Sequence, residues 1–337
     1  MIKKPNVMNA LTMKAVVAHR YGGPEVLQVA QMPAPSPAPN EVLIKVHASA
    51  VTTADGMMRS GKPWFGRMML GLRKPKHPIP GTGFAGQVQA AGAAVTRLQP
   101  GDRVFGETTL GFSTHAEYVT VPADGVLLPM PDALSYEEAA TFCDGPITSL
   151  NFLKAVAQLR PGQHVLINGA SGSLGTAAVQ LAKHLGAEVT GVCSSRNVGL
   201  VRSLGADRVI DYSRQDFTQQ GKQYDFIFDT VGKRSFRECK RALTLQGTYL
   251  SPVLSLRLLG QMLWSSRFGK QKAVFSATGL RPEEELRQLL QELASIYKAG
   301  KLKVVIDRQY PLEKIVEAHT YVASGHKRGN VILAIGL

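Results

Sequence analysis

Three glycines, Gly169, Gly172 and Gly175, follow a short apolar run in the middle of the chain at a spacing of three residues. The run at 164–168 predicts a buried strand, and the amphipathic segment that ends at Gly186 predicts a helix directly after the glycines. Glycines at such a turn let backbone N–H groups and the positive helix end approach a pyrophosphate without obstruction by side chains. Because the strand precedes the motif and the helix follows it, the sequence predicts a dinucleotide-binding turn.

The strand–helix unit then repeats along the chain. A short helix is expected at 197–204, and further strands are expected at 188–193, 208–210, 224–229 and 247–251. Strands that alternate with helices predict a parallel, doubly wound α/β sheet. An α/β domain of the same shape that binds no nucleotide is the alternative, and it would leave the glycine turn without a purpose.

The length of 337 residues fits two domains. Residues 13–130 are rich in Gly and Pro and contain alternating strands, which predicts a β-rich barrel after a mobile extension at 1–12. The nucleotide fold should occupy 131–279, beginning with a helical linker whose capping box pairs Ser135 with Glu138. The last part, 280–337, should contain a helix from 282 to 300, then strand, helix and strand over 304–334, and should return to the N-terminal part.

Composition excludes several classes of protein. Apolar residues make up 44% and charged residues 19% of the chain, which excludes global disorder. We find no apolar run of eighteen residues, so no membrane span is expected. Three separate cysteines without a pair motif suit a reducing compartment, and we expect the cytoplasm.

Net charge is +14, and part of it is local, because no acidic residue lies between Asp55 and Asp102. Such a surface attracts anions. A phosphorylated cofactor, an acidic membrane face and nucleic acid are the candidates, beside a surface that is simply basic. No known nucleic-acid module is visible, so we expect no nucleic-acid partner.

Five segments together resemble the medium-chain dehydrogenase/reductase superfamily, in its zinc-free, quinone-oxidoreductase-like branch. The resemblance extends from about Lys14 to Leu333 and rests on residues 13–27, 100–105, 159–172, 204–212 and 325–333. It implies a GroES-like catalytic barrel followed by a Rossmann domain. It also implies a homodimer, joined along the strand at 272–276.

The metal ligands of the zinc-dependent branch are missing. Catalytic zinc there needs a thiolate early in the barrel and a Gly-His-Glu motif. In this chain no cysteine precedes Cys143, and the corresponding stretch is Gly-Thr-Gly at 81–83. We therefore expect no metal. Without a Lewis acid, reduction of an activated acceptor is easier than oxidation of a simple alcohol.

The end of the second strand of the nucleotide fold indicates which cofactor is bound. NAD-selective folds usually place Asp or Glu there to hold the ribose hydroxyls. This chain has no acid at that point, and Ser194 and Arg196 could hold a 2′-phosphate instead. By resemblance Tyr212 lies near the same phosphate. These residues predict NADPH, with a solvated Arg196 as the alternative.

The resemblance also assigns the remaining cofactor contacts. Thr148 and Ser251 should lie near the nicotinamide, Val231 and Gly232 at a strand end, and Arg328 and Asn330 on a segment that reaches the cofactor. The predicted cofactor set is Thr148, Gly169, Ser171, Gly172, Ser173, Leu174, Gly175, Ser194, Arg196, Tyr212, Val231, Gly232, Ser251, Arg328 and Asn330.

The substrate side departs from the family pattern. Many relatives have Val-Asn-Pro with a tyrosine five residues after the asparagine, whereas this chain has Thr52 and Met57 at those positions. Thr52 could donate a hydrogen bond to a substrate oxygen, but Met57 cannot act as a phenol does. Asp55 could support this loop or lie on its surface. Trp64 belongs to a loop at 57–76 that is rich in Met, Trp and Arg and could cover an apolar acceptor.

Together these residues favour an NADPH-dependent enzyme that transfers hydride to a quinone or an α,β-unsaturated carbonyl compound. We identify no general acid. An aldehyde or ketone reductase on the same scaffold is one alternative. The other is a cofactor-binding sensor or interaction protein whose catalytic side has decayed, which the Thr52 and Met57 departures favour.

Overall fold

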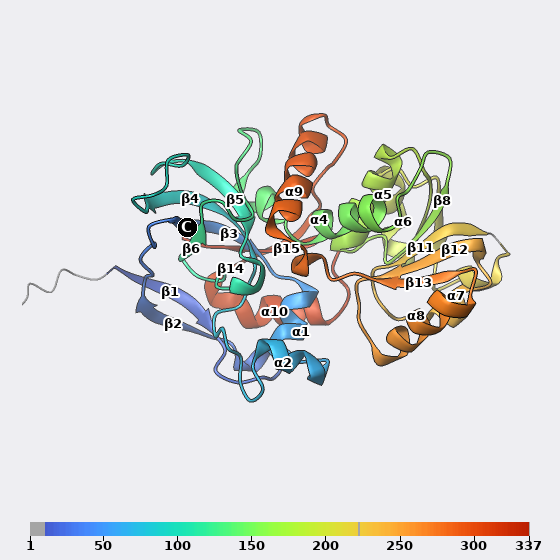
Figure 1. The fold of residues 1–337 in the computed structure, drawn as a ribbon, viewed down its shortest axis with the longest axis horizontal. Coiled ribbons are helices and arrows are strands. Elements are labelled where there is room, and N and C mark those ends of the chain that lie inside the picture. Colours follow the sequence, from blue (N-terminus) through green and yellow to red (C-terminus); the bar gives the residue numbers. More distant parts are fainter. Residues whose placement is uncertain (1–10, 222, 337) are drawn as a thin grey trace, which may run out of the picture. The chain divides into compact units, whose positions relative to one another are not determined.

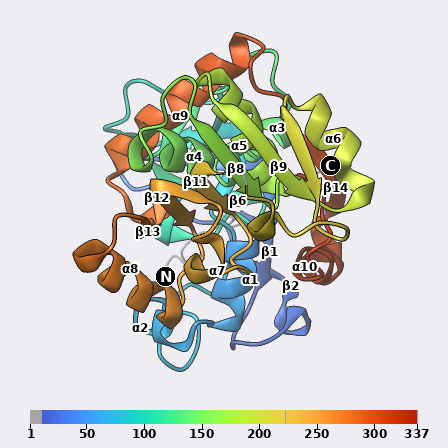
Figure 2. The same ribbon diagram turned by 90° about the vertical axis from the view of Figure 1, so that its right-hand side faces the viewer.

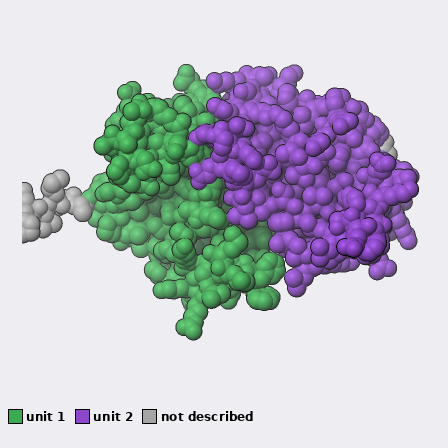
Figure 3. All heavy atoms as spheres, viewed as in Figure 1, with its two compact units in different colours: residues 1–140, 309–325, 332–337 green, residues 141–308, 326–331 purple. Residues whose placement is uncertain are grey.

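The computed structural model describes residues 11–221 and 223–336. The chain divides into two compact units, coloured separately in Figure 3. Unit 1 contains the chain up to Ala140 together with Gln309–Gly325 and Ile332–Leu337, and unit 2 contains Thr141–Arg308 and His326–Val331. The proposed extension at 1–12 lies mostly outside the described residues, and the first strand begins at Thr12.

Unit 2 is built on a six-stranded parallel sheet in the order β10-β9-β8-β11-β12-β13. The order reverses between β8 and β11, and such a reversal leaves a crevice at the carboxyl ends of the strands. The strands are β8 (His164–Asn168), β9 (Glu188–Cys193), β10 (Arg208–Asp211), β11 (Tyr224–Asp229), β12 (Leu243–Ser251) and β13 (Lys272–Phe275). The predicted parallel, doubly wound sheet is confirmed.

Helices cover both faces of this sheet, with α7 and α8 on the side opposite α5 (Figures 1 and 2). The helices are α4 (Gly145–Leu150, continued by a π-helical segment at Asn151–Val156), α5 (Ser173–His184), α6 (Val198–Ser203), α7 (Phe236–Cys239), α8 (Leu256–Phe268) and α9 (Glu283–Lys298). Apolar side chains from both layers are buried between sheet and helices, such as Leu166 and Ile227 of the sheet and Phe236 and Leu258 of α7 and α8.

Unit 1 is β-rich, as expected. Its larger sheet has the order β14-β15-β3-β4-β5-β7, with β6 paired to β3, and β1 pairs with β2 separately. The strands are β1 (Thr12–Val17), β2 (Gln28–Pro33), β3 (Glu41–Ala50), β4 (Gly83–Ala91), β5 (Arg103–Glu107), β6 (Tyr118–Pro122), β7 (Leu127–Pro129), β14 (Ile306–Pro311) and β15 (Asn330–Ala334). The helices are α1 (Thr53–Ser60), α2 (Arg67–Leu70), α3 (Tyr136–Ala140) and α10 (Ile315–Ala323).

Local predictions differ from the structure at two places. The strand expected at 304–306 begins only at Ile306, and the supposed loop at 57–76 contains the end of α1 and all of α2. The compact units divide after Ala140, and α9 belongs to unit 2. No helix in the described part of the chain is long and apolar enough to cross a membrane.

Candidate cofactor and substrate sites

The turn between β8 and α5 uses its three glycines for three different reasons. Gly169 has φ = +82°, and a Cβ there would lie 2.5 Å from Cγ2 of Val231, so glycine alone fits without strain. A Cβ on Gly175 would lie 2.1 Å from the carbonyl oxygen of Gly169, so glycine permits α5 to pack closely. The Cβ position of Gly172 is open, with its nearest neighbour at 3.5 Å. This open side is where backbone N–H groups can meet a pyrophosphate.

The segment at 328–330 lies directly beside this turn. The N–H of Gly329 donates to the carbonyl oxygen of Ser171 at 2.8 Å, and Gly172 and Gly329 form a parallel bridge. Arg328 is exposed, and its N–H donates to a carboxylate oxygen of Asp307 at 2.8 Å. The structure thus brings a late segment of the chain to the glycine turn.

Ser173, the first residue of α5, joins three segments. Its Oγ lies 2.7 Å from Oδ1 of Asn330 and 2.9 Å from Oδ2 of Asp144, so its single proton has two acceptors within reach. The amide nitrogen of Asn330 donates to the carbonyl oxygen of Val305 at 3.0 Å, which turns Oδ1 toward Ser173. The sequence analysis missed Asp144, which no glycine or strand pattern marks.

Helix α4 is fixed against the start of α5. A Cβ on Gly145 would lie 2.5 Å from Oγ of Ser173, and Ser149 Oγ donates to the carbonyl oxygen of Leu174 at 2.8 Å. Thr148 lies between these contacts and is half-buried. Its placement near the glycine turn therefore follows from close packing of the two helices.

The carboxyl end of β9 is tied to the glycine turn by a residue that the sequence analysis missed. Asn197 is buried, and its Nδ2 lies 3.0 Å from Oγ of Ser171 and 3.3 Å from Oγ of Ser194. Arg196 is exposed beside it, and no ion pair of Arg196 is found within the described ranges. The guanidinium can therefore reach an added anion without leaving another partner.

An acidic residue, Asp211, lies on the neighbouring strand end. Its carboxylate accepts hydrogen bonds from the hydroxyls of Ser195 and Ser213, and these bonds lower the pKa of Asp211, the Ser195 bond most. The next residue, Tyr212, is 60% exposed, and its N–H donates to the carbonyl oxygen of Cys193 at 3.0 Å. Tyr212 and the end of β9 thus share one edge of the sheet.

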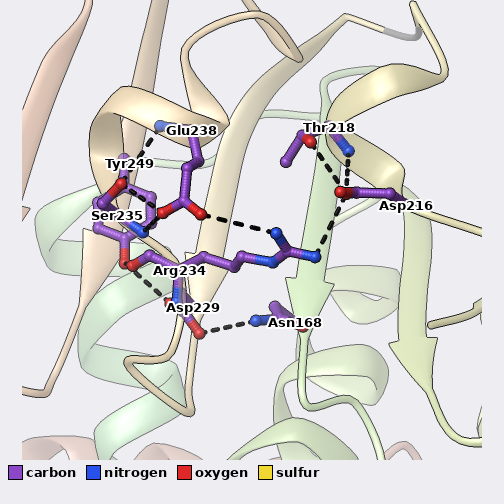
Figure 4. A network of polar contacts seen from close by, with 8 residues as sticks. All are labelled: Asn168, Asp216, Thr218, Asp229, Arg234, Ser235, Glu238 and Tyr249. Atoms are coloured by element: carbon purple, nitrogen blue, oxygen red, sulfur yellow. Dashed lines mark hydrogen bonds and ion pairs between the residues drawn. The ribbon is translucent and has the colours of Figure 1, made fainter. Parts of the chain in front are cut away.

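The buried carboxylate of Asp229 shapes the turn after β11 (Figure 4). Its Oδ1 accepts from the N–H groups of Val231 and Gly232 at 3.1 Å each and from Nδ2 of Asn168 at 2.9 Å. The hydroxyl of Tyr249 donates to Oδ2 at 2.8 Å, and burial together with this neighbouring carboxylate raises the pKa of Tyr249. The N–H of Arg234 donates to Oδ2 as well, at 3.2 Å, so five donors hold the predicted strand end in place.

Ser251 completes the same region from β12. It is buried, its Oγ donates to the carbonyl oxygen of Asp229 at 3.2 Å, and the N–H of Val253 donates to that Oγ at 3.2 Å. Its hydroxyl is thus used within the protein. Any contribution of Ser251 to a nicotinamide site would come from its backbone or from its packing.

These residues of unit 2 fit a dinucleotide. The open position at Gly172, the N–H groups at the start of α5 and the exposed Arg196 lie around the carboxyl ends of β8 and β9. The carbonyl oxygen and the hydroxyl of Ser171 already accept hydrogen bonds from Gly329 and Asn197, so the protein itself holds the glycine turn in shape. Such a site binds phosphate groups through backbone donors and the helix dipole.

In unit 1, Thr52 caps α1. Its Oγ1 accepts from the N–H of Asp55 at 3.0 Å and donates to Oδ2 of Asp55 at 2.8 Å, while the N–H of Thr52 donates to the same oxygen at 2.8 Å. Asp55 is only 1% exposed and is therefore the polar support of this segment rather than its surface. The single Thr52 proton is used within this capping box, so a substrate oxygen would have to compete with Asp55.

Buried polar groups surround Asp55. In the part of the chain that the structure describes, Oδ1 of Asp55, Nη1 of Arg59, Nδ1 of His115 and Nε2 of His319 have no hydrogen-bond partner. The ring of His115 faces the carbonyl oxygen of Ala50 through Nε2 at 3.1 Å, so Nε2 holds the proton. Beside them lies a cavity of about 30 Å³, lined by Ala18, Asp55, Met58, Arg59, Leu70, Pro75, His77, Pro78, Pro80 and Phe112.

Burial keeps both histidines neutral. It lowers the pKa of His115, against the attraction of Asp55. It also lowers the pKa of His319 to about 2, with further contributions from His115 and Arg59. The two rings lie 6.0 Å apart edge to face. Because an unfolded histidine takes up a proton more readily than these buried rings do, acid favours the unfolded state over the folded barrel.

The two remaining predicted substrate residues, Met57 and Trp64, differ in how far they are exposed to solvent. Met57 is half-buried on α1, whereas Trp64 is 73% exposed, so the structure does not place both in one enclosed pocket of unit 1. Among the described residues, no group of three or more His, Cys, Asp or Glu side chains is arranged to hold a metal ion.

Comparisons with known proteins agree with this architecture. Residues 38–132 match the family model of the alcohol dehydrogenase GroES-like domain, and residues 204–333 match that of the zinc-binding dehydrogenase. The Escherichia coli quinone oxidoreductase, solved in complex with NADPH, superposes with a TM-score of 0.83 at 26% identity, covering 95% of this chain and 99% of that one.

Curated relatives are similar over nearly the whole chain. The Homo sapiens quinone oxidoreductase is 30% identical (96% of this chain, 98% of the relative), and the Bos taurus mitochondrial NAD(P)H oxidoreductase RTN4IP1 is 32% identical (99% and 94%). The trans-enoyl reductase pgmF of Aspergillus terreus is 31% identical (88% and 87%). The chain belongs to the medium-chain dehydrogenase/reductase superfamily, in its quinone-oxidoreductase-like branch.

Proposed function

We propose that this oxidoreductase uses NADPH to reduce a quinone or an α,β-unsaturated carbonyl compound without zinc. The observation that carries the proposal is the open Gly172 position at the start of α5, together with the exposed Arg196 at the end of β9, which forms no ion pair with the residues that the structure describes. A neighbour solved with NADPH and relatives named quinone oxidoreductase and trans-enoyl reductase support it.

The cofactor supplies a hydride when it is bound, and the chain's own residues position it. Backbone N–H groups of the first turn of α5, from Ser173 onward, would hold the pyrophosphate, and Ser194, Arg196 and Tyr212 would hold the 2′-phosphate. The Asp229 network fixes Val231 and Gly232, which would form part of the wall at the nicotinamide end. The contribution of the protein is thus chiefly orientation.

On the acceptor side we propose Thr52 as the donor to the substrate oxygen, with Asp55 behind it. The hydroxyl would turn from Asp55 Oδ2 toward a substrate oxygen as negative charge develops there. Met57 and Trp64 would supply apolar contact. Zinc independence is proposed from the donor set, because the chain has no cysteine before Cys143 and Gly-Thr-Gly at 81–83.

An aldehyde or ketone reductase is the second enzymatic candidate, and a decayed cofactor binder is the third. The observation that supports the binder is the hydrogen bond from the Thr52 hydroxyl to Asp55 inside the capping box. We also propose a homodimer formed through β13, which is an edge strand of its sheet, and a cytoplasmic location.

An acceptor panel separates these candidates. Oxidation of NADPH is followed with a quinone, an enone and an aldehyde, before and after prolonged treatment with a chelator. The proposal expects turnover of the quinone or enone, little turnover of the aldehyde, and no effect of the chelator. Turnover of the aldehyde alone, loss of activity on chelation, or cofactor binding without turnover would each favour another candidate.

A further inference from the structure

Helix α8 exposes large apolar side chains, although it belongs to the folded core of unit 2. Its buried residues are Leu258 and Ser265, and the opposite side of the helix is turned to solvent. Four side chains on α8 are more than half exposed: Leu256 (68%), Leu263 (74%), Trp264 (52%) and Phe268 (72%). Large apolar side chains that are exposed together on one helix indicate an interaction surface.

The same surface is basic. Arg257 and Arg267 lie on α8, which has no acidic residue, and Lys240 directly follows the neighbouring α7. The Nζ of Lys240 lies 4.8 Å from the ring centroid of Trp264 and 5.8 Å from that of Phe236. A cation beside an exposed tryptophan ring places a charged group and an apolar surface next to each other, as is common where water meets an apolar phase.

A pocket between α7 and α8 gathers three of the cations. It has a volume of about 440 Å³ and is lined by Phe236, Arg237, Lys240, Arg257, Gly260, Gln261 and Trp264. Glu238 pairs with Arg234, and the nearby Arg257 also helps to lower the pKa of Glu238. No ion pair of Arg237 or Lys240 is found among the described residues, so these two cations are available to phosphate groups, which bind best to such clusters.

A second copy of the chain fits this surface poorly. If α8 packed against α8 of a second copy across a two-fold axis, the surface with Arg257, Arg267 and Lys240 would meet a surface with the same cations, and α8 has no acid to pair them. An anionic bilayer complements both features, because its headgroups attract cations and its interface accepts Leu, Trp and Phe.

We propose that α8 binds the surface of an anionic phospholipid membrane. Leu263, Trp264 and Phe268 enter the interface between headgroups and acyl chains, and the cations of the pocket hold headgroup phosphates. The helix lies on the membrane and does not span it. Binding does not depend on the proposed reaction, although an apolar quinone would be concentrated in the same bilayer.

Tryptophan fluorescence of the full chain tests this directly, because the chain contains only two tryptophans. In the Trp64→Phe variant, Trp264 is the single reporter. We expect its emission to shift to the blue with vesicles of phosphatidylcholine and phosphatidylglycerol in equal parts, and to be quenched by brominated acyl chains. Phosphatidylcholine alone should cause little change, and added salt should weaken the effect.

Flotation with the same vesicles supplies a second measurement. We expect the double change Leu263→Ser and Phe268→Ser to weaken binding by about tenfold or more. Leu245→Ser, at an exposed leucine of β12, is the matched control and should bind as the unmodified chain does.

Three outcomes would overturn the proposal. The first is a folded Trp64→Phe protein that shows no shift with anionic vesicles. The second is quenching in Trp264→Phe, where Trp64 reports, without quenching in Trp64→Phe. The third is a change in oligomeric mass, measured by light scattering, on substitution of α8 without any vesicle binding, which would assign this face to a second copy.

Discussion

Oγ of Ser173 lies 2.7 Å from Oδ1 of Asn330, a residue 157 positions later in the chain. This contact fixes the first turn of α5 to the segment that follows β14. Together with the bond from Gly329 to Ser171, it forms one wall of the glycine turn. A cofactor held at this turn would therefore depend on two distant parts of the sequence at once.

Substitutions of Gly172 and Gly175 should separate binding from stability. Gly172→Ala adds a methyl group on the open side of the turn, so the melting temperature should change little while the Kd for NADPH and NADH rises by about tenfold. Gly175→Ala places a Cβ against the carbonyl oxygen of Gly169 and should destabilise the fold by roughly 1–3 kcal/mol. Thermal melts and cofactor titrations check both. Unchanged cofactor affinity of Gly172→Ala would place the pyrophosphate elsewhere.

Arg196 should decide which cofactor is preferred. Arg196→Ala removes hydrogen bonds to a charged phosphate and should weaken NADPH binding by about 1.5–3 kcal/mol, with NADH binding nearly unchanged. Arg202→Ala, an exposed arginine on α6, is the control. Titration of both cofactors into all three proteins measures the difference. Tighter binding of NADH than of NADPH by the unmodified protein would contradict the assignment and give more weight to Asp211.

Thr52 should affect turnover but not cofactor binding. Thr52→Val removes the hydroxyl, so kcat with a quinone or enone should fall. The loss of transition-state stabilisation should be smaller than the value of about 2.7–4 kcal/mol found in enzymes that depend strongly on one such donor. It also removes the cap of α1, which costs about 0.5–2 kcal/mol of stability. Thr52→Ser keeps the hydroxyl and the cap and should behave as the unmodified protein. Steady-state kinetics and thermal melts of the same variants distinguish the loss of turnover from the loss of stability. Turnover by Thr52→Val at the original rate would show that another group donates to the substrate oxygen.

The buried histidines should make stability fall in acid. His319 stays neutral in the folded state because its pKa is lowered to about 2, whereas an unfolded histidine takes a proton below about 6.5. The unfolded state therefore binds more protons as the pH falls, and the unfolding free energy decreases, by roughly 2 kcal/mol at pH 5 for His319.

His319→Gln should remove one histidine's share of this decrease. Urea unfolding at several pH values measures the slope of the unfolding free energy against pH. A loss of packing lowers the unfolding free energy equally at every pH and so leaves this slope unchanged. His184→Gln, at an exposed position of α5, should retain the full slope. An identical slope in His319→Gln would mean that the ring is protonated within the fold.

The sequence predicted the elements whose local pattern decides their structure. β9 and β11 have the expected limits because their β-branched and aromatic residues favour a strand, and the Ser135–Glu138 capping box forms as expected. Helix α1 was hidden in an apparent loop, since its cap, Thr52 with Asp55, was interpreted as a substrate contact.

Other features depend on tertiary contacts that no local pattern encodes. Asn197 joins β9 to the glycine turn, and Asp229 collects donors from three segments. The available sequence signal for these contacts was a polar residue at or just after the end of a parallel strand, as with Asp229 and Asn197. Such residues come together because the carboxyl ends of parallel strands meet at the same edge of a sheet. The neutrality of His115 and His319 follows from burial, which spacing alone does not give.

Deuterium transfer from NADPH labelled at the reactive C4 position to an enone tests the central claim most directly. The proposed function expects a saturated carbonyl product with one deuterium on the β-carbon, detected by mass spectrometry and NMR, and with the same yield after treatment with a chelator. An allylic alcohol with deuterium on the carbonyl carbon would identify a carbonyl reductase instead, and bound NADPH without any labelled product would contradict the account.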